Sequence, residues 1–319
     1  MKVLYHLIHA LWYMFSLLPL AVLYVLADVL YFLVAHIVKY RGKVIKKNIR
    51  EAFPEMTEAE HCKIEKDFYH YFCDYLVETV KLMTMSEKQL RRRMVFEGTE
   101  MLEEMVYKGR SVGIYLGHYG NWEWITSLPH WVSDKALCAQ IYHPLENKTF
   151  DNLFRHVRER QGAVCIPMTE VLRRIVKYKK QGQPFIMGYI SDQAPMWFNI
   201  HHWVNFLHHD TPVFTGSERI MRSTGQAVFY GDVIRVKRGY YKCVMHPINL
   251  HPEDTKEWEL TDIYFQKLEQ TIRRHPGLYL WSHNRWKRTH EEFNLRYDKE
   301  TGRVSMENLE DLKRRKGIQ

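Results

Sequence analysis

The residues best suited to chemistry in this chain are His118 and Glu123, which lie in the stretch GHYGNWE at 117–123. The apolar run VGIYL directly before this stretch is typical of a short buried strand. A spacing of five residues keeps two side chains apart on a regular helix or strand. A turn at Gly120, followed by a helix capped by Asn121, would let Glu123 reach back to the imidazole. We therefore predict a general base, His118, with Glu123 as its orienting carboxylate; a purely structural pair is the alternative.

The elements that position this pair alternate along the chain. Strands are predicted over 112–116, 136–142, 163–167 and 183–190, and helices over 147–160 and 169–180. This order is typical of an α/β fold with a mixed, mostly parallel sheet flanked by helices, whose functional side chains gather where strands end. His118 and Asp192 each follow a predicted strand, so we expect both at one edge of the sheet.

The segments around this alternating region complete the predicted fold. A helix over 56–82 begins with a capping pattern, in which Thr57 is followed three residues later by Glu60. The remaining predicted elements are a helix over 211–224 with Pro212 near its start and Gly225 after its end, an antiparallel pair over 227–235 and 240–246, and a helix over 261–274.

The N-terminal segment, residues 3–38, is dominated by apolar and aromatic side chains and has no charge from 11 to 27. It is long enough for a membrane helix, which needs about 20 apolar residues. Lysines and arginines follow it between residues 39 and 50, and by the positive-inside rule they would keep the rest of the chain on the cytoplasmic side. Pro19 and Asp28 leave open a kinked or interfacial helix, and a buried helix of a soluble core is the remaining alternative.

The chain divides into three predicted regions by composition. Residues 1–40 form a membrane anchor, residues 41–297 an α/β domain, and residues 298–319 a polar C-terminal tail. A mean hydropathy of −0.41 argues against further membrane spans.

The charge balance indicates an anionic partner. The chain has 46 lysines and arginines against 37 aspartates and glutamates, a difference of 46 − 37 = +9. A nucleic acid, an anionic membrane surface or an acidic protein would each suit such a surplus. Composition alone does not choose among them.

Cysteine and histidine usage argues against thiol chemistry and against a metal centre. The five cysteines are odd in number and form no CxxC pair, so we expect reduced thiols in a cytoplasmic setting. Four histidines between 201 and 209 lack the spacing of known zinc ligands, and no metal is predicted. The tryptophans and phenylalanines among them favour an aromatic loop at a membrane surface or over an acyl chain.

Several blocks in order give the chain a specific resemblance. It resembles the bacterial lipid A biosynthesis acyltransferases, the late or secondary acyltransferases that carry an HxxxxD/E motif. The matching blocks are the hydrophobic start, NIREAFPE at 48–55, GHYGNWE at 117–123, the helix ending in RER at 158–160, SDQ at 191–193, TPVFTGSERIMRSTGQ at 211–226 and HPGLYLWSHNRWKR at 275–288.

The resemblance implies an enzyme of the inner membrane that faces the cytoplasm. It would move a fatty acyl chain from an acyl carrier protein thioester to a hydroxyl of a lipid A precursor, and it would need no cofactor. The motif falls on His118 and Glu123. The resemblance places Arg158 at the acceptor phosphate or the oxyanion, with Asp192 holding Arg158 or shaping the acceptor site. Arg160 and Asn121 complete the residues assigned to substrate binding.

Two alternatives accompany this hypothesis. The same motif could serve an acyltransferase whose acceptor is a glycerolipid, an aminolipid or another glycolipid. A basic, membrane-associated nucleic-acid-binding protein is the alternative from another class, supported by the net charge and by the tryptophans and basic residues at 281–288. No recognised nucleic-acid-binding module accompanies them, so we expect no nucleic acid among the partners.

Overall fold

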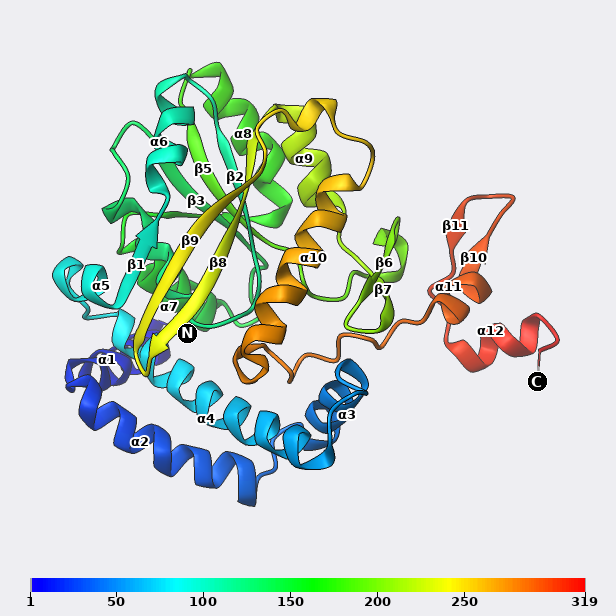
Figure 1. Ribbon diagram of the computed structural model, residues 1–319, viewed down its shortest axis with the longest axis horizontal. Coiled ribbons are helices and arrows are strands. Elements are labelled where there is room, and N and C mark those ends of the chain that lie inside the picture. The colour runs from blue at the N-terminus through cyan, green and yellow to red at the C-terminus, as the bar shows by residue number, and fades with distance from the viewer. Residues whose placement is uncertain (1, 319) are drawn as a thin grey trace.

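The structure is a computed structural model that describes residues 2–318, with side chains from residue 5 onward (Figure 1). Its centre is a seven-stranded sheet in the order β1-β9-β8-β2-β5-β3-β4. Every neighbouring pair is parallel except β8 and β9, so the predicted mixed, mostly parallel sheet is confirmed. The strands are β1 Met94–Glu97, β2 Val112–Leu116, β3 Leu137–Tyr142, β4 Val164–Pro167, β5 Phe185–Ile190, β8 Ala227–Lys237 and β9 Tyr240–Asn249.

The central strand β2 is buried along its whole length, with β5 on one side and β8 on the other. A strand with both faces covered reads as a continuous apolar run, and this is why VGIYL was recognisable from sequence. The helices around the sheet are α6 Thr99–Tyr107, α7 Lys148–Glu159, α8 Val171–Lys180, α9 Gly216–Thr224 and α10 Glu259–Arg274. Within α7 the predicted inner residues, Leu153 and Val157, are buried.

The long helix α4, Glu58–Leu82, crosses below the sheet, and the N-terminal helices lie on its other side (Figure 1). Its start has the predicted capping box, in which Thr57 and Glu60 bond each other's backbone N–H groups. The N-terminal elements are α1 Lys2–Leu17, α2 Leu20–Phe32, the π-helix η1 Leu33–Ile37, α3 Gly42–Ala52 and, after α4, α5 Glu87–Arg93. The predicted 3–38 segment is therefore two helices broken before Pro19, because a proline cannot continue the hydrogen-bond ladder of a helix.

One predicted element is wrong. The helix expected over 211–224 begins only at Gly216, and Pro212 ends strand β7, His209–Pro212, which pairs with β6, Trp203–Phe206. Pro212 is tolerated there because this hairpin has only two strands and the missing N–H belongs to an edge. The end of the helix was predicted correctly, since Gly225 closes it in the left-handed conformation.

The polar C-terminal residues also form small elements, to one side of the sheet in Figure 1. They are α11 His290–Arg296, the hairpin strands β10 Tyr297–Asp298 and β11 Arg303–Val304, and α12 Leu309–Arg315. Arg296 fastens them, because its Nη1 donates to the carbonyls of Ser305 and Glu307 at 3.1 and 2.8 Å. Five short 3-10 helices complete the elements within residues 2–318: η2 Trp124–His130, η3 Met168–Glu170, η4 Trp197–Asn199, η5 Pro252–Asp254 and η6 Pro276–Leu278.

Candidate active site

His118 and Asp192 meet at the edge of the sheet where β2 and β5 end. Leu116 pairs with Ile190 at the end of these neighbouring parallel strands, and each functional residue lies two positions further on. The sequence-based expectation that both lie at one edge is confirmed. This edge faces α4, whose Tyr71 and Tyr75 reach the loop between His118 and Glu123.

Asp192 holds His118 at two points. Its Oδ1 lies 2.6 Å from Nδ1 of the imidazole, and its Oδ2 accepts the backbone N–H of His118 at 2.9 Å. A carboxylate at Nδ1 fixes the neutral ring with its proton on that nitrogen, so the lone pair of Nε2 is free to act as a base. The His118 side chain is 20% exposed whereas that of Asp192 is 1% exposed.

The ionisation of Asp192 suits this role. Burial by itself would raise the pKa of the Asp192 carboxyl, but the His118 ring and the Arg285 guanidinium outweigh it and hold the pKa below its usual value. The carboxylate is therefore charged at neutral pH. It can stabilise a positive charge that forms on the imidazole.

The expected contact between Glu123 and His118 is not found among the described hydrogen bonds and ion pairs. His118 pairs with Asp192 instead, and Glu123 pairs with Arg158. Arg158 of α7 binds Glu123 in a bidentate pair, with Nε to Oε2 at 2.8 Å and Nη2 to Oε1 at 2.6 Å. Tyr75 also donates to Glu123, at 3.3 Å. The turn before η2 directs the Glu123 carboxylate toward α7, where a guanidinium fork is a stronger partner than an imidazole already held by Asp192.

The predicted turn at Gly120 is present and explains why glycine stands there. Its φ is +59°, and a Cβ at this position would lie 2.7 Å from Cγ1 of Val233. The backbone of Gly120 is pinned on both sides, because its carbonyl accepts from Tyr71 at 2.7 Å and its N–H donates to Leu278 at 3.0 Å. The loop therefore has one conformation enforced by two distant segments.

Asn121 is engaged in the internal hydrogen bonds of the loop, which gives its predicted role in substrate binding no support. The residue is fully buried. Its Oδ1 accepts the N–H of Trp124 at 3.0 Å, as a capping residue would, and its Nδ2 donates to Glu78 at 2.6 Å. The Asn121 side chain therefore holds the loop in place.

Glu78 of α4 was missed by the sequence analysis. This buried carboxylate accepts from Tyr24, Asn121 and Tyr241 at 2.8, 2.6 and 3.0 Å. Burial raises its pKa to about 7, against the opposing effect of the donors around it. The signal was its spacing: Glu78 follows Tyr71 and Tyr75 on the face of α4 that touches the loop, so it is an acidic residue on an otherwise buried face.

Arg160 lies apart from the other predicted residues. It caps the C-terminus of α7 and is exposed, whereas Arg158, two positions earlier, points to Glu123. Residues two apart on a helix project in different directions, so the two arginines do not share a site. No ion pair joins Arg160 to a described residue, and the structure gives no support for its role in substrate binding.

Three further residues near His118 were not identified from sequence. Gln193 Nε2 lies 3.4 Å from His118 Nε2, and the Trp122 ring packs edge-on at 5.2 Å from the imidazole. His283 accepts the N–H of Ala194 at 3.1 Å, and burial lowers its pKa to about 4, so it is neutral. The SDQ and SHN blocks thus meet in space, although they are about 90 residues apart.

The tryptophan and arginine segment at 281–288 is largely interior. Trp281 and Arg285 are each 1% exposed. Arg285 donates Nη2 to the Pro212 carbonyl at 2.8 Å, while its Nε and Nη1 have no hydrogen-bond partner in the described part of the chain. The segment therefore forms core with a basic interior charge, and this removes one of the two observations that favoured a nucleic-acid-binding protein; the other, the net charge of +9, is not specific to nucleic acids.

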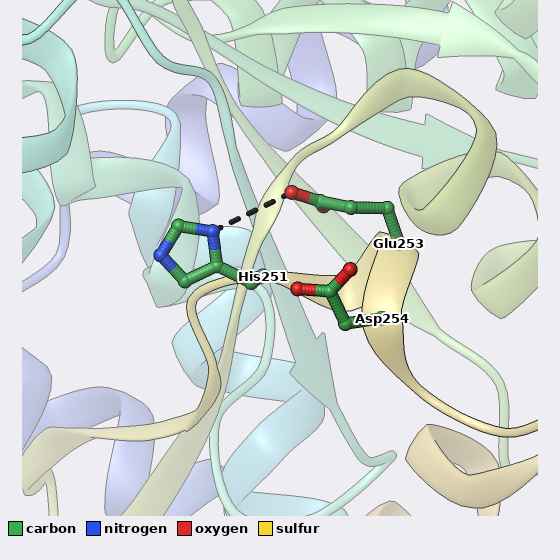
Figure 2. A group of neighbouring side chains, drawn as sticks. All are labelled: His251, Glu253 and Asp254. Atoms are coloured by element: carbon green, nitrogen blue, oxygen red, sulfur yellow. Dashed lines mark ion pairs between the residues drawn. The ribbon is translucent and has the colours of Figure 1, made fainter.

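Three of the four histidines at 201–209 lie near different acidic residues, Asp262, Glu55 and Glu51. His202 binds Asp262 at 2.7 Å, His208 lies 3.5 Å from Glu55, and His209 stacks on Trp286. One group elsewhere in residues 2–318 has the proximity that a metal site requires, namely His251, Glu253 and Asp254 (Figure 2). These side chains are exposed and follow β9, whose end pairs with the start of β8. They therefore lie at the opposite edge of the sheet from His118.

The fold and site define an α/β protein with a histidine–aspartate pair at the ends of two central parallel strands and a second glutamate–arginine pair beside it. Residues 2–288 match the family model for bacterial lipid A biosynthesis acyltransferases. The chain belongs to this family.

Two curated relatives match more weakly. They are the "Lipid A biosynthesis myristoyltransferase" of Escherichia coli (strain K12) and the "Lipid A biosynthesis acyltransferase 1" of Shigella flexneri, and each is 24% identical over 170 residues. The match covers 50% of this chain and 51% of each relative. The chain therefore spans about half the length of the curated relatives it matches.

Proposed function

We propose that the chain is an O-acyltransferase that moves a fatty acyl chain from an acyl carrier protein thioester to a hydroxyl of a lipid A precursor. Family membership supports the reaction class, and the names of the two relatives support the acceptor. The observation that carries the proposal is the bond from Asp192 to Nδ1 of His118, because it leaves Nε2 as a base at a partly exposed position.

In the proposed reaction, His118 Nε2 takes the proton of the acceptor hydroxyl while the hydroxyl oxygen attacks the thioester carbonyl carbon. The tetrahedral oxyanion then collapses, the carbon–sulfur bond breaks, and the leaving thiolate receives the proton from the imidazolium. Asp192 stabilises the imidazolium between these two steps. A thioester is already activated, so these bond-making and bond-breaking steps require neither a covalent enzyme intermediate nor a cofactor.

Arg158 is assigned to an anionic group in this reaction. Glu123 binds its Nε and Nη2, and the arginine side chain remains 22% exposed, so it presents a fixed positive charge beside the loop. Such a charge suits either a phosphate of the acceptor or the oxyanion of the transition state. Glu123 then acts through Arg158 as a positioning residue, not through His118.

The location and donor belong to the same proposal. The exposed apolar N-terminal helices and the basic segment after them support attachment to the inner membrane with the domain in the cytoplasm. Acyl carrier proteins are acidic, and a net charge of +9 favours their encounter with this chain. Activity with the carrier-bound donor should therefore fall as ionic strength rises, because salt screens the attraction.

Mass spectrometry of membrane lipids from cells with and without the gene tests the proposal. We expect lipid A to lose one acyl chain in the deletion strain and to regain it with the wild-type gene but not with His118→Ala. Unchanged lipid A beside an altered glycerolipid, aminolipid or other glycolipid would keep the reaction and overturn the acceptor. Full complementation by His118→Ala would overturn the mechanism.

A further inference from the structure

Helix α2 has two apolar faces, and only one of them is packed. Leu20, Leu23 and Ala27 recur at helical spacing and are buried on the side of α4. On the opposite side Val25 and Val29 are 63% and 56% exposed, and the other exposed members of this outer stripe are Val22, Leu26, Phe32 and Leu33. A helix that is apolar all round needs an apolar environment on both sides.

Helix α1 repeats this arrangement. Ile8 and Trp12 are partly buried and pack against the hydrophobic core, whereas Leu7, Leu11 and Met14 are exposed along the other side. More than half of the large apolar side chains exposed among the described residues lie between residues 7 and 40. Such a concentration of exposed apolar side chains is typical of a surface that binds another apolar phase.

Contacts with α4 hold both helices. Trp12 donates to the Val80 carbonyl at 3.0 Å, near the end of α4. Tyr31 stacks on His70 at 3.5 Å between ring centres, near its middle. Because α4 also reaches the His118 loop, α2 cannot cross a bilayer at a steep angle without drawing the α/β domain into the hydrocarbon.

Asp28 gives an independent argument against a perpendicular span. It lies at the middle of the 18-residue apolar stretch Leu20–Ile37, the candidate membrane span. Its carboxylate pairs with Arg238 at 2.6 Å, and the two side chains are 52% and 37% exposed. A spanning α2 would place this exposed ion pair at the centre of the bilayer, where charges are costly. A helix that lies in the surface would keep the pair at the polar boundary.

A cationic groove of about 980 Å³ lies where the apolar surface ends. Its walls come from the end of α2, η1, the turn after it, α3 and α4, and Tyr31, Ala35 and Tyr69 supply apolar contacts. Five cations line it: Lys39, Arg41, Lys43, Lys46 and Lys66. Among residues 2–318, only Lys46 of these five has an acidic partner within 4 Å, Glu65 at 3.9 Å. The groove therefore combines unpaired positive charge with an apolar floor.

The turn that carries these cations is fixed in shape. Lys39 and Arg41 both adopt φ of 51°, which L-residues rarely do. Tyr69 of α4 donates to the carbonyl of Tyr40 between them at 2.9 Å. The cations are thus gathered by the fold at one end of the exposed apolar surface.

We propose that α1, α2 and η1 lie in the plane of one bilayer leaflet with their outer stripe in the acyl region, and that the cationic groove receives the phosphate of an anionic phospholipid. The protein is then monotopic rather than anchored by a spanning helix. Charge complementarity and the continuity of the groove with the apolar stripe support this occupant. The inference does not depend on acyl transfer, because it concerns binding to a bilayer without any acyl donor.

Depth measurements test the orientation. Fluorescent labels are attached to single cysteines at Val22, Val29 and Leu33, three members of the outer stripe, in a Cys62→Ser background, since Cys62 is the one exposed native thiol in residues 2–318. Quenching by lipids that carry nitroxides at different depths then places each label in vesicles of phosphatidylglycerol and phosphatidylcholine. We expect equal depths for the three labels. A graded depth of about 16 Å between positions 22 and 33, the rise of eleven helical residues, would establish a span and overturn the proposal.

Charge variants test the groove. Lys39→Gln with Lys66→Gln should weaken binding to vesicles containing phosphatidylglycerol about fivefold for each charge removed, with no effect on pure phosphatidylcholine. The matched control is Lys177→Gln with Lys180→Gln on α8, which lies at the far end of the molecule in Figure 1 and should bind as wild type. Equal losses in both pairs would show a diffuse effect of net charge and would overturn the headgroup site.

Discussion

The loop from Gly117 to Glu123 and the surface of α1 and α2 are opposite kinds of structure in one molecule. The loop is held from several directions, by Asp192, by Tyr71, by Leu278 and by Glu78 through Asn121. The N-terminal helices are held on one side and bare on the other. Chemistry needs fixed atoms, whereas a surface that meets a fluid bilayer needs only the right polarity. Substitutions in the two regions should therefore fail in different ways.

The largest effect is expected for substitution of His118, the proposed general base in the loop. His118→Ala should lower kcat by about 10³-fold or more, because no general base then removes the proton from the hydroxyl of the acceptor lipid. The side chain is partly exposed, so the thermal midpoint should stay within a few degrees of wild type. Single-turnover transfer from an acyl carrier protein thioester measures the first quantity and circular dichroism the second. A large drop in the thermal midpoint would assign His118 a structural role instead.

The next effect separates the two carboxylates. Asp192→Asn should lower kcat by about 10²-fold to 10³-fold, because an amide neither fixes the Nδ1 proton nor stabilises the imidazolium. Glu123→Gln should act mainly on KM for the phosphorylated acceptor, because it loosens Arg158. Steady-state kinetics with both variants provides the measurement. A larger loss of kcat in Glu123→Gln than in Asp192→Asn would restore the pairing expected from sequence.

Glu78 predicts a pH dependence of stability. Its pKa is about 7 in the folded protein and about 4.5 when unfolded, so the folded state binds the proton more tightly between these values. The stabilisation that Glu78 contributes is then complete below about pH 4.5 and is lost as the pH rises through 7, by roughly 3 kcal/mol in total. Glu78→Gln should remove this slope in denaturant unfolding measured from pH 5 to 8. A parallel slope in both proteins would mean that another group causes it.

A matched pair on α2 includes the smallest expected effect, that of Val29→Ala on stability. Leu23→Ala on the packed face should lower the free energy of unfolding by about 2–4 kcal/mol. Val29→Ala on the bare face should change it by less than about 0.5 kcal/mol in detergent-free solution. The same Val29→Ala should weaken binding to vesicles. A destabilised Val29→Ala without vesicles would show that the outer stripe is packed against protein.

The fold was predictable wherever a pattern depends on neighbours along the chain. The buried strand before His118, the capping box at Thr57 and the glycine after α9 were all found in this way. The shared edge of His118 and Asp192 followed from a general rule of parallel sheets.

The sequence-based predictions were wrong where the outcome depends on the direction in which a side chain points or on a partner distant in sequence. Spacing showed that Glu123 needs a turn to approach His118, yet it could not show that the turn aims the carboxylate at α7. Pro212 was assigned to a helix because the sequence did not indicate that it pairs with Trp203 in a β-hairpin. Arg285 was counted among the basic residues that favoured a nucleic-acid-binding surface, since a basic residue is rarely buried alone. The sequence could not show that one face of α2 packs on α4 while the other is exposed, because a helix that is apolar all round gives the same sequence signal in a bilayer and in a protein core.

Glu78 also has a consequence for how the protein assembles. Its two oxygens join Tyr24, Asn121 and Tyr241, so three segments separated by about 100 residues each converge on one side chain. The loop cannot reach its final shape until helix α2, helix α4 and strand β9 have all docked. Loop order is therefore a property of the complete fold, and the amide protons of this loop should exchange with solvent only through global opening.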